Sequence, residues 1–345
     1  MFSDIDLKKL RALQETEEHT IVDVRSPSEF YEATIPDSIN IPIFSDAERA
    51  EVGTLYKQIG PKAAEERGLE IFSAKLPTFI QAFKQIDTPI TVFCWRGGMR
   101  SKTAATVLDL MGIKANRLTG GYRTYREWVV DTLATLDFKP KLYVLNGYTG
   151  SGKTVILKQL EKAGYPVIDL EGMANHRGSI FGEIGLEGSN QKCFDAQLVE
   201  KLLAFQEENY VFIEGESKRI GKVTMPDHLF QKKEESTQVF VLLPLEERIK
   251  HILEDYQPWN YPDKIIEAYK LIKKRIHTPI AKEIEEDLKS ENYAHAVEQL
   301  LTYYYDPQYK HSAISYPEDK IINITAHSTE EATNKIKHRL TSNDR

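Results

Sequence analysis

The chain has 345 residues, of which 41% are hydrophobic and 28% are charged, and its formal net charge is -7. The composition is typical of a folded globular protein, and the length favours two domains, because single domains usually have about 100 to 200 residues. The negative charge argues against indiscriminate binding to nucleic acid, although an acidic protein can carry a local basic face. No apolar run reaches the roughly 18 residues of a membrane span, and the start lacks the apolar core of a signal peptide, so we expect a cytoplasmic protein without membrane contact.

The first part of the sequence alternates short apolar runs with helix-like stretches. Residues 20–24 and 89–95 are predicted to be strands, and 101–112 has the apolar spacing of a helix that ends at Gly112. This alternation is typical of a parallel sheet with crossover helices. Cys94 therefore falls at the end of a strand, and the residues after it lead into a helix.

The segment after this strand, called here the cysteine loop, is a candidate catalytic and anion-binding site. It consists of Cys94, Trp95, Arg96, Gly97, Gly98, Met99 and Arg100. Two arginines, two flexible glycines and a helix N-terminus would favour an anion here, either a thiolate or a bound tetrahedral ion. The only other cysteine, Cys193, is too distant for a zinc or disulfide pattern, so both are expected to be reduced. From the residues alone, Cys94 is equally well a small buried residue at a strand end.

A second strand, loop and helix begin near residue 139. The loop, called here the phosphate loop, consists of Gly147, Tyr148, Thr149, Gly150, Ser151, Gly152, Lys153 and Thr154. It fits the pattern G-x-x-x-x-G-K-[ST], in which backbone N–H groups and the lysine bind a polyphosphate. The threonine hydroxyl of this pattern can bind Mg²⁺. We therefore predict a polyphosphate site, with Mg²⁺ as the candidate metal.

Four residues near this loop are candidates for further contacts to a phosphate or a metal. Asp169 and Glu214 each end an apolar run, and His176 and Arg177 stand beside Gly178 in a predicted loop. The alternative roles are those of turn, capping or solvated loop residues. Further strands are predicted at 165–170, 210–215, 237–244 and 320–325.

The predicted fold class is α/β, with two domains. Residues 1–137 are expected to form a parallel-sheet domain, and residues 138–345 a P-loop NTPase-like α/β domain with a helical C-terminal region. The boundary is placed after the helical stretch that ends near Leu136.

The first domain resembles the rhodanese family, in which the cysteine accepts a chalcogen atom and passes it on. The matching residues are Asp23, Val24, Arg25, Glu29, Phe30, Ile35, Pro36, Asp37, Ser38, Asn40, Ile41 and Pro42, with the cysteine loop. Asp23 and Arg25 are candidates to brace that loop. Thr34 stands where many rhodaneses have histidine. The loop is also one residue longer than the common sulfurtransferase loop, which suggests a substrate that carries a phosphate group.

Over essentially the whole chain, the motifs resemble those of the tRNA 2-selenouridine synthase family. They are residues 52–60, the cysteine loop, 120–126, the phosphate loop, 174–182 and 216–221, in this order. The resemblance implies that selenium from selenophosphate replaces sulfur in wobble-position 2-thiouridine of tRNA. It also implies an S-geranylated intermediate made from geranyl diphosphate. On this reading Cys94 handles the chalcogen, and our hypothesis is that the phosphate loop binds the diphosphate.

Two other classes of function remain open at this stage. One is a kinase or nucleotide hydrolase with a rhodanese-like regulatory or sulfurtransferase domain, and the other is a non-catalytic RNA-binding module. Basic and aromatic residues in 216–221, 269–277 and 302–312 suit single-stranded RNA, or else form charged helix faces. The sequence does not decide whether ATP binds.

Overall fold

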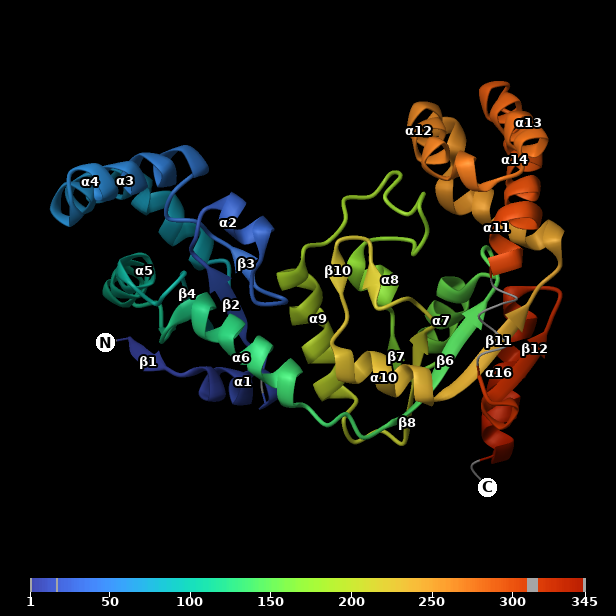
Figure 1. Ribbon diagram of the computed structural model, residues 1–345. Helices are drawn as coiled ribbons and strands as arrows, with labels where there is room; N and C mark the ends of the chain where they lie inside the picture. The colour runs from blue at the N-terminus through green and yellow to red at the C-terminus, as the bar shows by residue number, and fades with distance from the viewer. Residues whose placement is uncertain (1, 17, 309–315, 344–345) are drawn as a thin grey trace. The chain divides into compact units, whose positions relative to one another are not determined.

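The computed structural model describes residues 2–16, 18–308 and 316–343 (Figure 1). The chain divides into two compact units, one of residues 1–136 with 195–199, the other of residues 137–194 and 200–345. Each unit contains a five-stranded sheet in which all neighbouring strands are parallel. The predicted α/β class is therefore confirmed. Within the described ranges, no helix has the length and apolar character to cross a membrane.

The sheet of the first unit has the order β1-β5-β4-β2-β3. The strands are β1 (Ser3–Ile5), β2 (Thr20–Asp23), β3 (Ile39–Asn40), β4 (Ile90–Phe93) and β5 (Ala115–Leu118). The helices are α1 (Leu7–Thr16), α2 (Pro27–Glu32), α3 (Asp46–Gln58), α4 (Pro61–Phe83), α5 (Met99–Leu110) and α6 (Gly121–Thr135). Strand β1 pairs with β5 through Ser3 and Asn116, so the two ends of this unit's sequence meet at one sheet edge.

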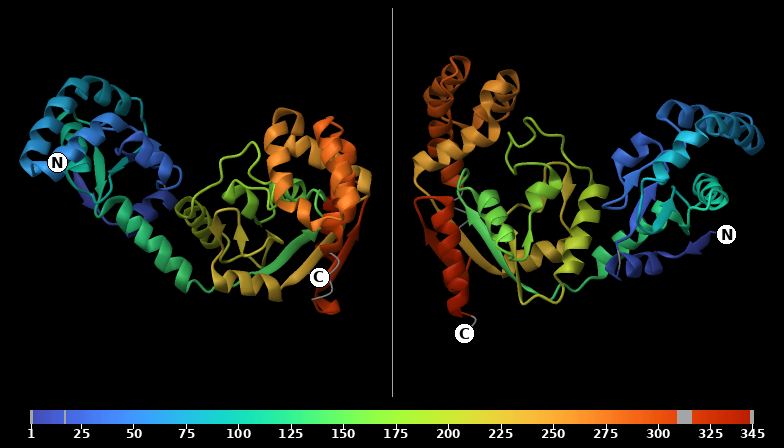
Figure 2. Two further views of the ribbon diagram at one scale, coloured as in Figure 1. Left: turned by 45° about the horizontal axis from the view of Figure 1, so that its top comes forward. Right: turned by 180° about the vertical axis from the view of Figure 1, so that it is seen from behind.

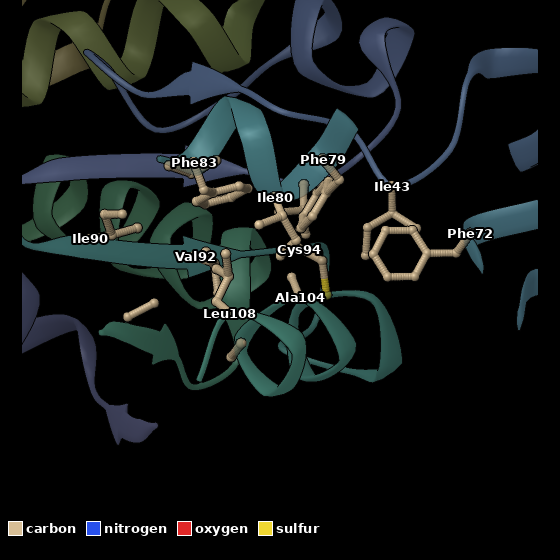
Figure 3. Close-up of a cluster of buried hydrophobic side chains, with 14 of the residues drawn as sticks. Ile43, Phe72, Phe79, Ile80, Phe83, Ile90, Val92, Cys94, Ala104 and Leu108 are labelled. Atoms are coloured by element: carbon tan, nitrogen blue, oxygen red, sulfur yellow. The ribbon is translucent and has the colours of Figure 1, made fainter. Parts of the chain in front are cut away.

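The central strand β4 fixes the start of the cysteine loop. All four of its residues are buried, because it lies between β2 and β5 and helices cover a parallel sheet on both faces. Its Val92 packs in a core with Phe83 of α4 and Leu108 of α5. Figure 3 shows Cys94 among the side chains of this core, near Ile80 and Ala104.

The sheet of the second unit has the order β12-β11-β6-β8-β7. The strands are β6 (Lys141–Gly147), β7 (Val167–Ile168), β8 (Tyr210–Glu214), β11 (Thr237–Leu242) and β12 (Ile321–Thr325), and β9 (Arg219–Ile220) and β10 (Val223–Thr224) form a separate antiparallel pair. The helices of this part of the chain are α7 (Lys153–Lys162), α8 (Leu170–Ala174), α9 (Gln191–Ala204), α10 (Asp227–Glu235), α11 (Leu245–Tyr256) and α16 (Thr329–Asn343), and residues 195–199 of α9 are grouped with the first unit.

A group of helices follows α11 and has its own apolar core. It contains α12 (Pro262–Ile272), α13 (Thr278–Lys289), α14 (Tyr293–Leu300) and a π-helix, η3 (Leu301–Tyr305). In Figures 1 and 2 these helices, drawn in orange, lie beyond the carboxyl end of β6, where the phosphate loop begins. A π-helix is rare and often occurs at a functional site. The predicted helical C-terminal region is therefore present, and it borders the phosphate loop.

Candidate functional site

The cysteine loop connects the end of β4 to the first turn of α5, which begins at Met99. Gly97 has a φ of 64°, in the left-handed region. A Cβ atom at this position would lie 2.9 Å from both the Leu118 carbonyl oxygen and the Gly120 nitrogen. The loop therefore needs glycine here, because it passes directly against the turn that follows β5.

That turn also holds the cysteine loop by backbone hydrogen bonds. The carbonyl of Cys94 accepts from the Tyr122 N–H, and the carbonyl of Trp95 accepts from the Arg123 N–H, both at 2.9 Å. In addition, the Arg117 guanidinium donates to the Gly97 carbonyl at 3.0 Å. The shape of the loop is thus set by residues on the next crossover as well as by its own sequence.

Asp23 and Arg25 form a buried ion pair behind the loop. The shortest contact, from Arg25 Nη2 to Asp23 Oδ2, is 2.6 Å, and the two side chains are 2% and 0% exposed. The Arg25 guanidinium lies 4.5 Å from the centre of the Tyr122 ring. Because the Tyr122 N–H binds the Cys94 carbonyl, this pair contacts the loop through Tyr122. The arrangement supports the proposal that Asp23 and Arg25 brace the loop.

Cys94 itself is only 3% exposed. Its Sγ lies 3.2 Å from the Ser101 hydroxyl, and the opposite side of the residue joins the apolar core (Figure 3). A thiol this buried can react only with an atom that is delivered into the loop. Trp95, Arg96, Gly98 and Met99, in contrast, are exposed and can meet an incoming ligand.

The second arginine of the loop is engaged in an ion pair. Arg100 binds the Glu29 carboxylate through both terminal nitrogens, and Arg49 lies 3.5 Å from the same carboxylate. Burial disfavours the Glu29 anion, but the hydrogen bonds from Arg100 outweigh this and hold the pKa of Glu29 below its usual value. An anion that binds Arg100 therefore has to compete with Glu29.

The phosphate loop has the geometry that its motif predicts. It begins at the last residue of β6, Gly147, and ends in the first turn of α7. Gly150 and Gly152 have φ angles of 80° and 71°, which only glycine adopts readily. The loop lines a pocket of about 240 Å³. Its backbone and the α7 N-terminus form a surface suited to a polyphosphate.

Helix α11 supports this loop through contacts that the sequence did not reveal. The buried Arg248 donates from Nε to the Thr149 carbonyl at 2.9 Å, and it pairs with Asp306. The His251 Nδ1 atom lies 3.0 Å from the Gly150 carbonyl oxygen. The sequence of α11 has the pattern of an ordinary amphipathic helix, so it does not indicate that Arg248 and His251 bind the phosphate loop.

Three glutamates surround the lysine and threonine of the phosphate loop. The Thr154 hydroxyl lies 3.0 Å from Glu171 Oε2 and 3.2 Å from Glu214 Oε1. Lys153 Nζ lies 3.7 Å from Glu216 Oε1. Glu214 was predicted from the sequence as a contact to a phosphate or a metal, whereas the sequence did not indicate Glu171 or Glu216.

Two of the carboxyl groups near Thr154, those of Glu171 and Glu214, have pKa values above the usual range for glutamate. Burial, followed by the charge of Glu216, raises the pKa of Glu171 to about 7. Burial and the charge of Glu171 also raise the pKa of the fully buried Glu214. These groups therefore hold protons more tightly than ordinary carboxyls, because their negative charges are close together and poorly solvated.

Hard oxygen ligands suit Mg²⁺, and Thr154, Glu171 and Glu214 could supply them. In the part of the chain that the structure describes, no cluster of three or more His, Cys, Asp or Glu side chains could hold a metal ion. A cation at Thr154 would therefore need oxygen atoms from a bound phosphate as further ligands. This is how Mg²⁺ commonly binds next to a phosphate loop.

The other predicted contacts divide into two groups. Arg177 lines the phosphate-loop pocket, where its guanidinium donates to the Ile184 and Asp255 carbonyls at 2.8 Å. Asp169 caps α8 by accepting from the Gly172 N–H at 2.7 Å. His176 is buried, and its Nδ1 accepts from the Gly178 N–H at 3.1 Å. Asp169 and His176 thus make local contacts in the structure. Residues 309–312 of the basic and aromatic segments lie outside the described residues.

Comparison with known proteins identifies families over both units. The family described as the tRNA 2-selenouridine synthase AAA domain matches residues 140–342, and the rhodanese-like domain family matches residues 6–127. The tRNA 2-selenouridine synthase of Nitrosomonas europaea is 32% identical over 84% of this chain and 88% of its own length. The protein of the same name from Aeromonas salmonicida is 33% identical over 84% of this chain and 86% of its own.

Among solved structures, the N-terminal domain of a protein from Clostridium difficile is 34% identical. The match covers 37% of the present chain and 99% of the solved domain, with a TM-score of 0.35.

The first prediction concerns the ion pair behind the cysteine loop. Asp23→Asn leaves Arg25 buried without its charge partner, which should lower the free energy of unfolding of the first unit by about 3 to 5 kcal/mol. Urea unfolding of the full chain measures this. The matched control is Glu127→Gln, which breaks the exposed pair of Arg123 and Glu127 and should leave the midpoint nearly unchanged. Equal effects of the two substitutions would show that the buried pair is not structural.

The second prediction concerns Glu171. The folded protein keeps a proton on this residue up to a pH of about 7, whereas the unfolded chain releases it near 4.5. The folded state therefore loses stability as the pH rises through this window. Glu171→Gln removes that loss, so its melting temperature relative to wild type should increase from pH 4.5 to 7 and then level off.

Calorimetry of the two proteins across this range measures the difference. Glu207→Gln, at an exposed position of the same unit, should show a constant difference instead. A constant difference for Glu171→Gln as well would contradict the raised pKa.

Proposed function

The chain belongs to the tRNA 2-selenouridine synthase family, and from this premise we propose that it replaces sulfur by selenium in 2-thiouridine at the wobble position of tRNA. The observation that carries the proposal is the presence of two complete loops in one family member. One loop presents a reduced thiol, and the other has the geometry for a polyphosphate.

The proposed reaction has two steps. The sulfur of 2-thiouridine first attacks the geranyl group of geranyl diphosphate, so that a C–S bond forms and diphosphate leaves. Selenide released from selenophosphate then attacks the carbon of the base that carries the sulfur, so that a C–Se bond forms, the C–S bond breaks and the geranyl thiolate leaves. Geranylation assists the second step because a thioether sulfur leaves more readily than a thiocarbonyl sulfur.

We assign the selenium step to the cysteine loop. The buried Cys94 thiol is the proposed chalcogen-handling nucleophile: its thiolate attacks the phosphorus of selenophosphate, so that an S–P bond forms, the P–Se bond breaks and selenide is released, and water then frees the phosphate from the sulfur. The Ser101 hydroxyl, 3.2 Å away, is the proposed partner for the thiol proton. Arg96 is exposed at the loop and is the proposed contact for the phosphate of selenophosphate. The bracing by Tyr122, Arg25 and Asp23 supports a fixed loop, which a small anionic donor requires.

We assign the diphosphate to the phosphate loop. Its glycine-rich backbone, the α7 N-terminus and Lys153 offer positive charge to the two phosphates and to the diphosphate that leaves. Mg²⁺ bound by Thr154 would supply further charge. The tRNA is the proposed macromolecular partner, because the named relatives are tRNA-modifying synthases.

A second candidate function has one observation in its favour. The carboxylates of Glu171 and Glu214 beside Thr154 resemble the acidic groups that position Mg²⁺ or water in nucleotide hydrolases. If the protein is such an enzyme, it should turn over ATP at a rate that depends on Lys153 and does not require tRNA.

The third prediction tests the role of the cysteine. Wild-type protein, geranyl diphosphate and selenophosphate should convert 2-thiouridine tRNA to 2-selenouridine tRNA, as measured by mass spectrometry of the nucleosides. Cys94→Ala should reduce this product to below about one percent, because it removes the nucleophile. Cys193→Ala is the matched control and should retain the activity. Full activity of Cys94→Ala would remove the thiol from the mechanism.

The fourth prediction separates the two steps. Lys153→Ala should slow geranyl transfer on the order of a hundredfold, because the diphosphate loses a charged contact. The same variant should still convert previously geranylated tRNA to the selenium product. Lys158→Ala, at an exposed position of α7, should leave both steps intact. Equal loss of both steps in Lys153→Ala would contradict the assignment of one donor to each loop.

A further inference from the structure

A second pocket adjoins the phosphate loop in the same unit, and its walls are apolar. It has a volume of about 60 Å³, against about 240 Å³ for the phosphate-loop pocket, so it is the smaller of the two. Aliphatic side chains from four elements line it, including Ile252 of α11, Ile265 of α12, Leu288 of α13 and Val297 of α14. The π-helix contributes Leu301.

The two pockets are adjacent and share part of their lining. Thr149, Ser179, Ile252, Tyr256 and Tyr305 line both of them. Ile252 lies against the phosphate loop, since a Cβ atom on Gly150 would come within 2.9 Å of its Cδ1 atom. A molecule bound by its phosphates at Gly150 would therefore have the apolar pocket directly beside it.

The hydroxyl groups of Ser179 and Tyr256, which line both pockets, bind each other and so are not free to bind a polar ligand. Their hydrogen bond has a length of 2.8 Å. Burial raises the pKa of Tyr256, so this wall stays uncharged at neutral pH. Tyr293 also lines the pocket, and its hydroxyl oxygen is buried without a hydrogen-bond partner among the described residues. A nucleobase has several polar edge atoms to satisfy, whereas a hydrocarbon chain has none.

We propose that this apolar pocket binds the hydrocarbon chain of the diphosphate ester whose phosphates bind at the phosphate loop. The inference rests on the proposed function, because it takes geranyl diphosphate as that ester, and it adds where the chain lies and what selects its length. Residues of the π-helix and α14 then form the part of the pocket that limits the length of the bound hydrocarbon chain. Helices α11 to α14 give this P-loop unit a site for an amphiphilic substrate.

The fifth prediction follows from chain length alone. Binding to the wild-type protein is measured by calorimetry for inorganic diphosphate and for the C5, C10 and C15 prenyl diphosphates. Affinity should rise at least about tenfold from inorganic diphosphate to the C10 ester, because the chain leaves water. It should gain nothing further at C15, because the pocket has a volume of only about 60 Å³. Equal affinity for inorganic diphosphate and the C10 ester would overturn the proposal.

Val297→Trp provides the matching variant, because Val297 is only half-buried and its side chain borders the pocket. The indole should fill the pocket, remove the gain from the C10 chain and leave the affinity for inorganic diphosphate unchanged. Ala294→Trp, at an exposed position of the same helix, is the control and should bind as wild type does. If Val297→Trp also loses inorganic diphosphate, Val297→Ala serves instead and should improve binding of the C15 ester.

The outcomes separate this inference from the proposed function. Unchanged preference for the C10 ester in Val297→Trp would overturn the pocket assignment, even if geranyl transfer to tRNA is intact. Tighter binding of ADP than of the C10 ester, unaffected by Val297→Trp, would also overturn it. Absence of geranyl transfer with the chain-length preference retained would instead reject the proposed reaction and keep the pocket.

Discussion

Both candidate sites depend on a central parallel strand that is buried on both faces and ends in a loop. Strands β4 and β6 lie between neighbouring strands of their sheets, so the position of their last residues is fixed by packing and backbone pairing. The loops that follow meet a helix N-terminus, where backbone N–H groups lack partners within the helix. The same constraint thus produces two candidate anion-binding segments with different chemistry, a thiol in one unit and a lysine in the other.

The features that could be predicted from the sequence are local ones. The apolar runs before Cys94 and Gly147 indicated β4 and β6, and glycine spacing indicated the loop backbones at Gly97, Gly150 and Gly152. The strand predicted at 165–170 was too long: the segment contains only β7 (Val167–Ile168), because Asp169 caps a short helix and ends the strand. Leu170 was included in the predicted strand because it is apolar, but it is a buried residue of α8, and hydrophobicity alone does not distinguish a buried helix residue from a strand residue.

The contacts that the sequence could not reveal join residues that are distant along the chain. Arg248 and His251 bind carbonyl groups of the phosphate loop across about a hundred residues. Glu171 meets Thr154 because β6, β8 and β7 lie side by side in the sheet, so the segments that follow β6 and β7 come together at one edge. Nothing in the spacing of these residues distinguishes them from other charged residues on amphipathic helices. The protonation of Glu171 is also a property of the folded state alone, since it arises from burial among other carboxylates.

The pairing of β1 with β5 has a consequence for how the protein is made. Ser3 leaves the ribosome well before its partner Asn116, which follows only after most of the unit has been synthesised. Until then, β1 and the exposed edge of the forming sheet have unpaired backbone groups, and such edges favour aggregation. The second unit has the same property at β12, which pairs with β11 only after the helical group between them has emerged. Efficient production of this enzyme therefore depends on how well nascent chains are shielded during translation.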